Sequence, residues 1–389
     1  MIKTIDECFF QIQNGANIKQ GNADGGFPIT RIETTANDKF NRDRMGYAGI
    51  TDIVKYKKYI LEDGDLLMSH INSMQYLGRT VLYVKQPNET IIHGMNLLRL
   101  KARRDVINPS YARYCFYGHK FRSQIGNITK KSVNQASFAV KDLKQIKIDI
   151  PSLDEQIKIA GILDKLQKLI DMRNEELEAF DNFVKSRFIE MFGDMKLNKR
   201  GWKLKSFEEL TYLITDGEHA TPKRTDKGIY LLSARNILNH SLQLKDVDYI
   251  NEKEYDRIAK RIIPQEGDIL ISCSGTVGRC CSVPSGFHFQ MVRSVALIRF
   301  KEYINPIFAE YMITSDYLQE QINSSKTVSS QANLFRGKIR TLKGFVPPIE
   351  MQNEFSVFVH KIDKSKLAVQ KSLDELETLK KSLMQEYFG

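Results

Sequence analysis

The chain has 389 residues, 42% of them hydrophobic and 27% charged, which is enough for two domains of ordinary size with hydrophobic cores. Its formal net charge of +11 is spread over the whole length, and this favours an extended polyanion over a small acidic ligand as the partner. No run of eighteen apolar residues occurs, and Asp6 and Glu7 interrupt the N-terminus, so the sequence predicts neither a membrane span nor a signal peptide.

Cysteine and histidine usage indicates neither a disulfide framework nor a metal centre. The five cysteines show no paired spacing, which suits the reducing cytoplasm where we place the protein. The adjacent Cys280 and Cys281 could form half of a metal site, but a strand with one buried face is the simpler interpretation. The seven histidines include no pair four residues apart, so we expect no zinc site and no other metal.

Residues 1–150 predict a domain of short strands with one clear helix. An acidic-Gly-Asp turn begins the segment 62–69, whose apolar end is typical of a strand. Asn108-Pro109 then marks a helix start, with Asn as the N-cap and Pro at the first helical position, and this helix is expected to run to about Ile125. A polar loop follows from Lys130 to Ser137.

The segment from Pro151 to Gly193 predicts one long helix, because it is rich in good helix formers and has no further proline. Its apolar stripe repeats every seventh residue, the signature of a helix that packs lengthwise against another. The stripe consists of Leu163, Ile170, Leu177, Val184 and Met191. At ~1.5 Å per residue, a helix of this length makes a rod on the order of 60 Å, which we interpret as a spacer.

The second half of the chain repeats the first over nearly its whole length. The turn and strand of 62–69 return at 265–272, and Leu97–Leu100 resembles Leu297–Phe300. Asn305-Pro306 repeats the helix start. A second long helix is predicted from Pro347 to Gly389, and its stripe is Phe355, Ile362, Val369, Leu376 and Leu383.

Two helices that cannot bury their stripes alone most simply pair with each other, although each could instead lie on its own domain. We therefore expect an α+β fold with two similar mixed α/β domains separated by two long helices, which pack as an antiparallel coiled coil. Such pairing of equivalent helices gives an internal pseudo-two-fold repeat. The expected boundaries are 1–150 for the first domain, 151–197 for the first long helix, 198–346 for the second domain and 347–389 for the second long helix.

Motifs for catalysis are weak. Asn108-Pro109-Ser110-Tyr111 nearly matches the Asn-Pro-Pro-Tyr signature of adenine-amino methyltransferases, but Asn305-Pro306-Ile307-Phe308 departs from it in the same way. No glycine-rich turn for a methyl donor precedes either copy, and no nucleotide-binding phosphate loop occurs. We expect no catalysis by this chain alone and interpret both motifs as helix caps, with a degenerate adenine methyltransferase as the enzymatic alternative.

Recognition is the remaining class of function. Bases are contacted by Arg, Asn, Gln, Ser and Thr, and phosphates by Lys and Arg. Such residues gather in corresponding loops of the two predicted domains, although a solvated surface role would explain any single one. In the first domain they are Asn72, Ser73, Gln75, Arg79, Lys130, Asn134 and Gln135. In the second domain they are His219, Thr221, Lys223, Arg224, Ser274, Thr276, Arg279, Gln331 and Asn333.

The chain resembles, over essentially its whole length, the specificity subunits of type I restriction-modification systems. The residues that carry the resemblance are the run Pro151–Gln156 before the long helix, the run Ser186–Asp194 near its end, and Gly267–Ser272 followed by Gly275–Arg279. The resemblance implies two target-recognition domains joined by a central and a C-terminal conserved helix. Each domain is then expected to recognise one half of a bipartite site in double-stranded DNA.

The resemblance also implies partners. The helices would set the gap between half-sites and dock two modification (methyltransferase) subunits, to which restriction subunits add. The methyl donor, ATP and Mg would belong to those partners, so we expect no cofactor on this chain. The alternative is a protein-interaction scaffold, built on a coiled-coil spacer, that binds no DNA. The first domain departs from the second in lacking a counterpart of Trp202 and of the compact Ser274-Gly275-Thr276.

Overall fold

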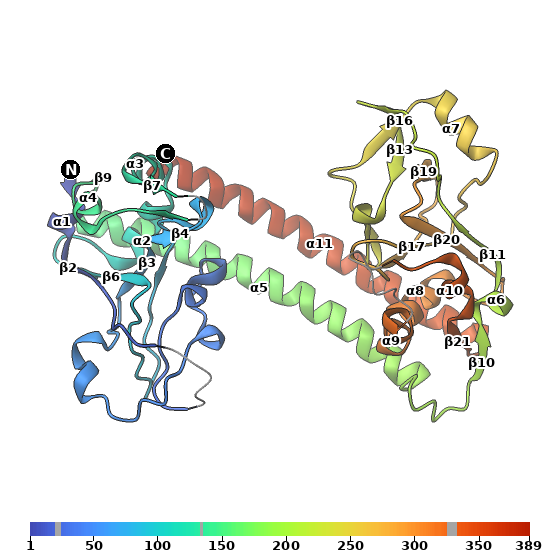
Figure 1. Ribbon diagram of the computed structural model, residues 1–389, viewed down its shortest axis with the longest axis horizontal. Helices are drawn as coiled ribbons and strands as arrows, with labels where there is room; N and C mark the ends of the chain where they lie inside the picture. Colours follow the sequence, from blue (N-terminus) through green and yellow to red (C-terminus); the bar gives the residue numbers. More distant parts are fainter. Residues whose placement is uncertain (20–24, 133–134, 325–332) are drawn as a thin grey trace. The chain divides into compact units, whose positions relative to one another are not determined.

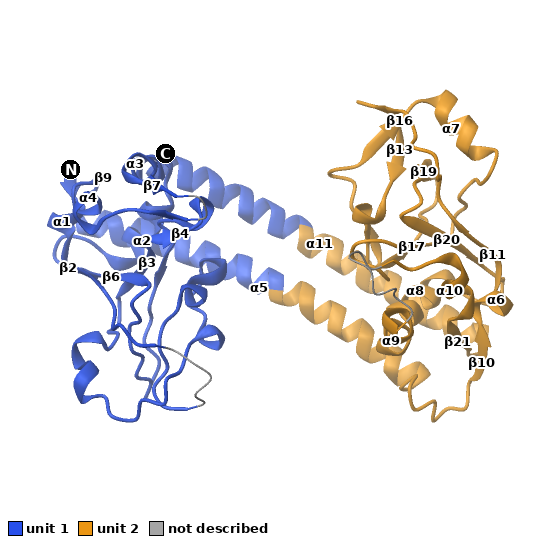
Figure 2. Cartoon of the chain, viewed as in Figure 1, with its two compact units in different colours: residues 1–174, 371–389 blue, residues 175–370 orange. Residues whose placement is uncertain are grey.

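The computed structural model describes the chain except for residues 20–24, 133–134 and 325–332 (Figure 1). It divides into two compact units, and each unit contains part of both long helices (Figure 2). Unit 1 comprises residues 1–174 and 371–389, and unit 2 comprises residues 175–370. The division therefore cuts each long helix, whereas the sequence-based boundaries treat each long helix as a segment of its own.

Unit 1 is built on a four-stranded antiparallel sheet in the order β2-β6-β3-β5. The strands of this sheet are β2 (Phe9–Asn14), β6 (Leu97–Ala102), β3 (Leu66–Ser69) and β5 (Thr80–Leu82). The smaller strands are β1 (Ile2–Thr4) with β9 (Lys147–Asp149), and β4 (Ile71–Asn72) with β8 (Ala136–Ser137) and β7 (Lys130–Lys131). The helices of this head are α1 (Ile5–Cys8), α2 (Pro109–Tyr117), α3 (His119–Ile128) and α4 (Val140–Lys144), with short 3-10 turns η1 (Ile32–Asp38), η2 (Arg42–Arg44), η3 (Val54–Tyr59) and η4 (Met74–Tyr76).

Unit 2 repeats this sheet as β11-β20-β17-β18. Its strands are β11 (Thr211–Asp216), β20 (Val295–Phe300), β17 (Ile269–Ser272) and β18 (Cys280–Ser282). A second sheet, in the order given, contains β12 (Arg224–Thr225), β16 (Asp248–Ile250), β13 (Ile229–Leu232) and β19 (Phe289–Met291). Two pairs complete the strands: β10 (Lys203–Ser206) with β21 (Lys343–Val346), and β14 (Ile237–Leu238) with β15 (Ser241–Leu242). The helices are α6 (Phe207–Leu210), α7 (Glu252–Ala259), α8 (Pro306–Thr314), α9 (Asp316–Ser324) and α10 (Arg336–Thr341), with the 3-10 turn η5 (Ala234–Asn236).

The strand pairing corrects one part of the sequence comparison. Leu66 pairs with Leu100 in unit 1, and the equivalent Ile269 pairs with Ile298 in unit 2. The alignment of Leu97–Leu100 with Leu297–Phe300 is therefore wrong by two residues. A shift of two leaves every side chain on the same face of the sheet, so the hydrophobic pattern cannot reveal it.

The single helix predicted after each Asn-Pro pair is also wrong, because each is divided into two. Gly118 has extended backbone angles (φ −66°, ψ 150°) and separates α2 from α3. Ser315 does the same between α8 and α9, with φ −64° and ψ 150°. Both Asn residues are helix caps as expected, since the Asn108 side chain accepts a hydrogen bond from the Tyr111 amide and the Asn305 side chain accepts one from the Ile307 amide.

Two buried glutamines attach these caps to the long helices. In unit 1, Gln156 Oε1 accepts a hydrogen bond from the Asn108 amide (2.9 Å), and Gln156 Nε2 donates to the carbonyls of Val106 and Pro151. In unit 2, Gln352 makes the equivalent three bonds, among them one of 2.8 Å from the Asn305 amide. These hydrogen bonds therefore fix the start of each long helix against the helix that Asn108 or Asn305 caps.

The long helices are α5 (Leu153–Phe192) and α11 (Ile349–Phe388), of 40 residues each. In unit 2, Lys366 pairs with Asp181 (2.6 Å) and Arg187 pairs with Glu354 (3.0 Å). Residue numbers therefore rise along one helix as they fall along the other, so the two helices run antiparallel. In unit 1, Lys380 donates to Gln167, and the ends of both helices enter one hydrophobic cluster.

The heptad stripes face inward. Six stripe residues are buried: Leu163, Ile170, Val184, Met191, Phe355 and Val369. The other four are partly buried: Leu177, Ile362, Leu376 and Leu383. In unit 2 the stripe joins an aromatic cluster in which the Phe188 and Phe355 rings lie 5.3 Å apart and Phe188 lies 5.8 Å from Phe308 of α8. The expected fold class, two similar mixed α/β domains with two long antiparallel helices and an internal repeat, is confirmed.

Candidate nucleic-acid interface

In unit 1 the structure brings together two loops that are far apart in the sequence. Strand β4 follows β3 directly and pairs with β8, so that Asn72 lies opposite Ala136. Strand β8 also pairs with β7, which places Lys130 opposite Ser137. The polar residues predicted after β3 and those predicted between β7 and β8 therefore belong to one surface, which we call the unit 1 loop surface.

Most candidates on the unit 1 loop surface are accessible. Ser73, Gln75, Lys130 and Gln135 are exposed, and Asn134 lies outside the described residues. Asn72 is partly buried and has a local role, because its Nδ2 donates to Ser69 Oγ (3.2 Å) and its Oδ1 accepts from the Ser73 amide (2.8 Å). The exposed four are thus the candidates of this loop set whose side chains solvent reaches most freely.

Arg79 is held in place by its neighbours. Its Nε lies 2.8 Å from Asp38 Oδ1, and its guanidinium carbon lies 4.5 Å from the centroid of the Tyr76 ring. Asp38 has a left-handed backbone conformation (φ 57°) and also accepts a hydrogen bond from the Tyr117 hydroxyl (2.9 Å). The charge of Arg79 is therefore partly compensated, unlike that of Lys130.

Unit 2 gathers its loops at the equivalent place. Ser274, directly after β17, forms a β-bridge with Asn333, and the Leu334 amide donates to the Cys273 carbonyl (2.9 Å). Thr276 is exposed, whereas Ser274, Arg279 and Asn333 are partly buried. Gln331 lies outside the described residues. The segment after β17 and the segment before α10 thus form the unit 2 loop surface.

The remaining candidates follow β11. His219 is 60% exposed at its side chain, and its Nε2 lies 2.9 Å from Asp216 Oδ2. Thr221 and Lys223 are exposed, and the Lys223 amide donates to Glu254. Arg224 is directed elsewhere, because it pairs with Asp248 of β16 (2.9 Å).

Sequence reasoning did not select Arg261 or Arg336, which also reach Asp216. Arg261 Nη2 lies 3.3 Å and Arg336 Nη1 lies 4.0 Å from Asp216 Oδ1. Arg261 follows α7 and Arg336 begins α10, so no local spacing connects either arginine with β11. Their positive charge was the sole signal in the sequence, and that signal is shared with many surface residues.

Metal ligands, thiols and apolar helices are the other features of the described residues that bear on function. Among them, no group of three or more His, Cys, Asp and Glu side chains could hold a metal ion. Burial raises the pKa of the Cys8 thiol to about 11 and that of Cys273 to about 12, so these thiols stay protonated at neutral pH. No helix in the described part of the chain is long and apolar enough to cross a membrane.

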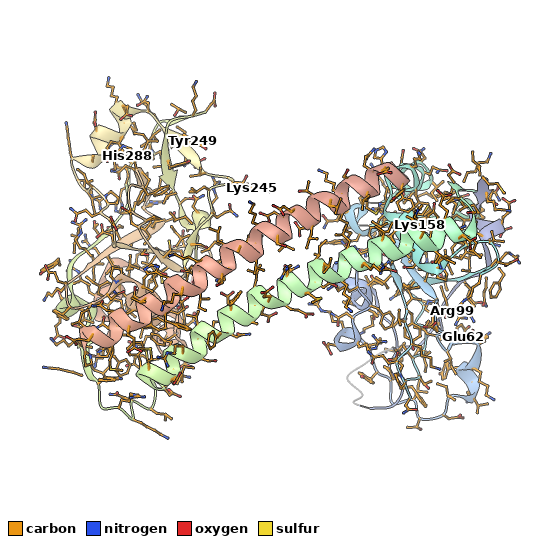
Figure 3. The ribbon with its side chains drawn as sticks, turned by 180° about the vertical axis from the view of Figure 1, so that it is seen from behind. Glu62, Arg99, Lys158, Lys245, Tyr249 and His288 are labelled. Atoms are coloured by element: carbon orange, nitrogen blue, oxygen red, sulfur yellow. The ribbon has the colours of Figure 1, made fainter. Side chains whose placement is uncertain are left out.

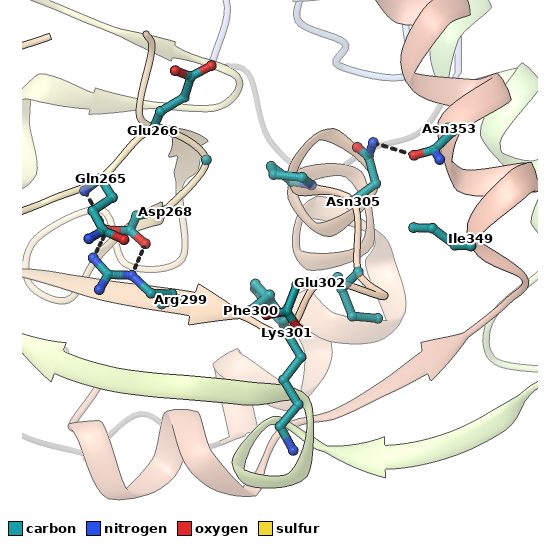
Figure 4. Close-up of a pocket in the computed structure, with 13 residues that line it drawn as sticks. Gln265, Glu266, Asp268, Arg299, Phe300, Lys301, Glu302, Asn305, Ile349 and Asn353 are labelled. Atoms are coloured by element: carbon teal, nitrogen blue, oxygen red, sulfur yellow. Dashed lines mark hydrogen bonds and ion pairs between the residues drawn. The ribbon is translucent and has the colours of Figure 1, made fainter. Parts of the chain in front are cut away.

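One small pocket in unit 2 is lined by polar side chains (Figure 4). It has a volume of about 300 Å³ and lies beside Asp268, which Arg299 contacts with two bonds of 2.7 Å. Across it, Asn305 donates to Asn353 (2.9 Å). These polar groups are paired with one another, and Asp268 precedes β17 whereas the unit 2 loop surface follows it. We therefore interpret the pocket as structural.

The chain was compared with known protein families. The model of the type I restriction modification DNA specificity domain matches twice, at residues 2–179 and 199–378. The chain belongs to this family. The two matches coincide with the two halves of the internal repeat, and sequence recognition in DNA is therefore the function of the chain.

Individual relatives agree with this family. The proposed specificity subunit of the type I restriction enzyme MjaX of Methanocaldococcus jannaschii is 27% identical over 400 aligned residues, which cover 98% of this chain and 91% of the relative. The specificity subunit of the type I restriction enzyme EcoKI of Escherichia coli K12 is 23% identical and aligns with 47% of this chain and 40% of its own length.

Solved structures support the fold. The S subunit of a type I restriction-modification system from M. genitalium matches 100% of this chain and 96% of its own length, with a TM-score of 0.61 and 14% identity. A chain from a study of complex assembly and conformational transition in the type I system matches 100% of this chain and 97% of its own, with a TM-score of 0.53 and 15% identity.

Proposed function

We propose that the chain acts as the specificity subunit of a type I restriction-modification complex, in which domains 1–150 and 198–346 each recognise one half of a bipartite DNA site. The observation that carries the proposal is the equivalent convergence of loops in the two units. Asn72 lies opposite Ala136 in unit 1, and Ser274 lies opposite Asn333 in unit 2. One scaffold thus presents different side chains at the same place, as two different half-sites require.

The long helices, which we assign to segments 151–197 and 347–389, set the distance between the two half-sites in this proposal. A helix of 40 residues is on the order of 60 Å long, which corresponds to at most roughly 17 base pairs of duplex. The glutamine contacts at both helix starts support this role, because they fix where each helix leaves its domain.

We further propose that the helices dock two modification (methyltransferase) subunits. Apolar residues are exposed on α5 within unit 1, where Ile157 is 51%, Leu169 is 45% and Met172 is 52% accessible. On α11 within unit 2, Leu367 is 72% accessible. Groups of exposed apolar side chains on a helix favour a protein partner. Restriction subunits would join through these partners, in the cytoplasm, and the methyl donor, ATP and Mg would be held by the partners.

The first test is selection of duplexes from a random-sequence pool by the full chain, with and without a type I methyltransferase subunit. We expect one motif with two specified halves separated by an unspecified gap, and affinity that falls steeply between ~50 and ~200 mM salt. Binding that is indifferent to salt and sequence would contradict the proposal. Such a result would favour the alternative, a scaffold that recruits proteins through its helices.

The second test lengthens the helices. Seven residues are inserted after Asp171 of α5 and seven after Leu376 of α11, so that both heptad stripes continue in phase. The insert adds about 10.5 Å, and the required gap should grow by about three base pairs. Insertion of the same segments with glycine at every position is the control, since it should abolish binding at a defined gap. An unchanged gap in the helical insert would refute the spacing role.

A further inference from the structure

Asp216 is the meeting point of two arginines and one histidine in unit 2. It ends β11 and lies 2.9 Å from His219 Nε2, 3.3 Å from Arg261 Nη2 and 4.0 Å from Arg336 Nη1. Its own side chain is 27% exposed, and that of Arg336 is 50% exposed. One carboxylate cannot neutralise two guanidinium groups, so the cluster keeps a positive charge that solvent can reach.

The two arginines of the cluster are held differently. Arg261 is anchored, because its Nη1 donates to the Gly217 carbonyl (2.8 Å) and its Nη2 approaches Thr215 Oγ1 (3.4 Å) as well as Asp216. Arg336 has Asp216 as its one charged partner within the described part of the chain, at the long distance of 4.0 Å. Most of the five donors of Arg336 therefore remain available to a ligand.

Arg336 also lies at the unit 2 loop surface. It follows Leu334 by two residues, and the Leu334 amide donates to the carbonyl of Cys273, directly before Ser274. The start of α10 is thereby fixed beside the loop that carries Ser274 and Thr276. Arg336 and those two polar residues consequently face the same ligand if unit 2 binds DNA there.

We propose that Arg336 is a specificity-determining residue of unit 2 that contacts a guanine, and that Asp216 is its positioning residue. This inference rests on the proposed function. A guanidinium offers two parallel donors that match O6 and N7 of guanine in the major groove, the commonest specific contact between a side chain and a base. The Asp216 carboxylate, 4.0 Å from Arg336 Nη1, attracts the guanidinium without occupying most of its donors, and a lysine cannot reproduce the paired donors.

The equivalent positions of unit 1 lack this pair. Asn14 ends β2 as Asp216 ends β11, and Val140 begins α4 as Arg336 begins α10. Neither residue offers a charge. The inference therefore concerns the half-site of unit 2 alone, and the half-site of unit 1 serves as an internal reference in every experiment.

The test compares the motifs that wild type, Arg336→Lys and Asp216→Asn select from a pool of random-sequence duplexes. Arg336→Lys keeps the charge, and we expect it to lose preference for one guanine by about tenfold while all other positions keep theirs. Asp216→Asn should relax the same position by a smaller factor. Arg340→Lys is the matched control, because Arg340 lies on the same helix but pairs with Glu208, and its motif should equal that of the wild type.

The experiment separates failure of this inference from failure of the proposed function. An unchanged motif in Arg336→Lys, or an equal loss of affinity for every sequence, would overturn the inference and leave the proposed function intact. A wild-type chain that selects no motif would overturn the proposed function itself. Thermal unfolding followed by the fluorescence of Trp202, the single tryptophan of the chain, reports whether unit 2 of each variant is folded. Should Arg336→Lys be unfolded, the motif of Asp216→Asn decides the question.

Discussion

In β6 of its four-stranded sheet, unit 1 buries Arg99. At the equivalent position of β20, unit 2 buries Leu297. The strand pairing makes these positions equivalent, since Leu67 lies opposite Arg99 and Leu270 lies opposite Leu297. Arg99 is 1% exposed and Leu297 is fully buried. Arg99, which is labelled in Figure 3, donates to the carbonyls of Ile60 (2.8 Å) and Lys58 (2.7 Å) and lies 3.8 Å from Asp65.

The aspartate of this turn finds a different partner in each unit. Asp268 of unit 2 is held by Arg299 with two bonds of 2.7 Å, and hydrogen bonding to Asp268 raises the pKa of Arg299. At the equivalent of Arg299, unit 1 has Lys101, which pairs with Glu62 instead (2.5 Å). Asp65 forms its ion pair with Arg99. Burial raises the pKa of Asp65 and lowers that of Arg99.

Unit 1 therefore tolerates a more polar interior than unit 2. Among the described residues, five buried side-chain atoms of unit 1 have no hydrogen-bond partner, against one atom in unit 2. Those of unit 1 include Arg99 Nε, His93 Nδ1 and Tyr83 Oη. Buried polar atoms without partners reduce stability, so two units with the same strand order in their main sheet can differ in their free energies of unfolding. The comparison predicts that unit 1 has the lower free energy of unfolding.

The largest effect is expected when the arginine of unit 1 is copied into unit 2. Leu297→Arg would bury a charge whose acceptors are already occupied, because Arg299 uses Asp268 and the Ile263 carbonyl. We expect a loss of about 4 kcal/mol in the unfolding free energy of unit 2. Trp202 fluorescence measures it, and Ile263→Arg, at a residue that is 56% exposed, is the control. A Leu297→Arg protein of wild-type stability would disprove the comparison.

The reverse change is expected to be milder but still destabilising. Arg99→Leu removes the buried positive charge beside Asp65, which keeps its hydrogen bond from the Glu62 amide, and leaves two carbonyl groups without their donor. We expect unit 1 to lose about 3 kcal/mol at neutral pH. Hydrogen exchange in β3 and β5 measures the loss. Adding Asp65→Asn should recover part of it, because the uncompensated carboxylate is then absent, and no recovery would show that Asp65 is not the cause.

A third test concerns the glutamine contacts that the two units share at the start of their long helices. Gln156→Ala and Gln352→Ala each remove three hydrogen bonds from a buried helix start. We expect each to cost about 2 kcal/mol, and each within its own unit only. Hydrogen exchange in α2 and in α8 separates the effects. Clearly unequal losses would mean that the two helix starts are not equivalent.

The smallest effect is a pH dependence confined to unit 1. Burial lowers the pKa of His93 to about 3, and burial also lowers the pKa of His70. A lowered folded-state pKa gives stability that is complete above the unfolded value of about 6.5 and is lost as pH falls toward the folded value. We expect His93 to lower the free energy of unfolding of unit 1 by about 1 kcal/mol when the pH falls to 5.5. His93→Asn should remove this dependence, and a dependence that persists unchanged would assign it elsewhere.

The repeat and the helices could be predicted because their signals are local and periodic. The stripe from Leu163 to Met191 and the cap at Asn108 each need one segment of chain and one physical rule. The break at Ser315 could not be predicted, because serine does not exclude a continuing helix.

Residues brought together by tertiary contacts were beyond sequence reasoning. Arg99 looks like any surface arginine until the strand register places it inside, and a two-residue shift of that register leaves no trace in the pattern. The loop surfaces were anticipated as groups, since their residue types gather in corresponding loops. Arg336 was not, because tertiary contacts, the bridge between Ser274 and Asn333 and the hydrogen bond from the Leu334 amide, bring the start of α10 to that surface.

Unit 2 is one unbroken stretch of chain, whereas unit 1 needs residues 371–389 to complete its core. Phe388 is 4% exposed there and packs on the ring of Tyr111 at 5.2 Å. A chain that lacks residues 371–389 would therefore keep every residue of unit 2 but leave the core of unit 1 incomplete. Such a truncated chain should be cut by protease within residues 1–174 and resist it within residues 175–370.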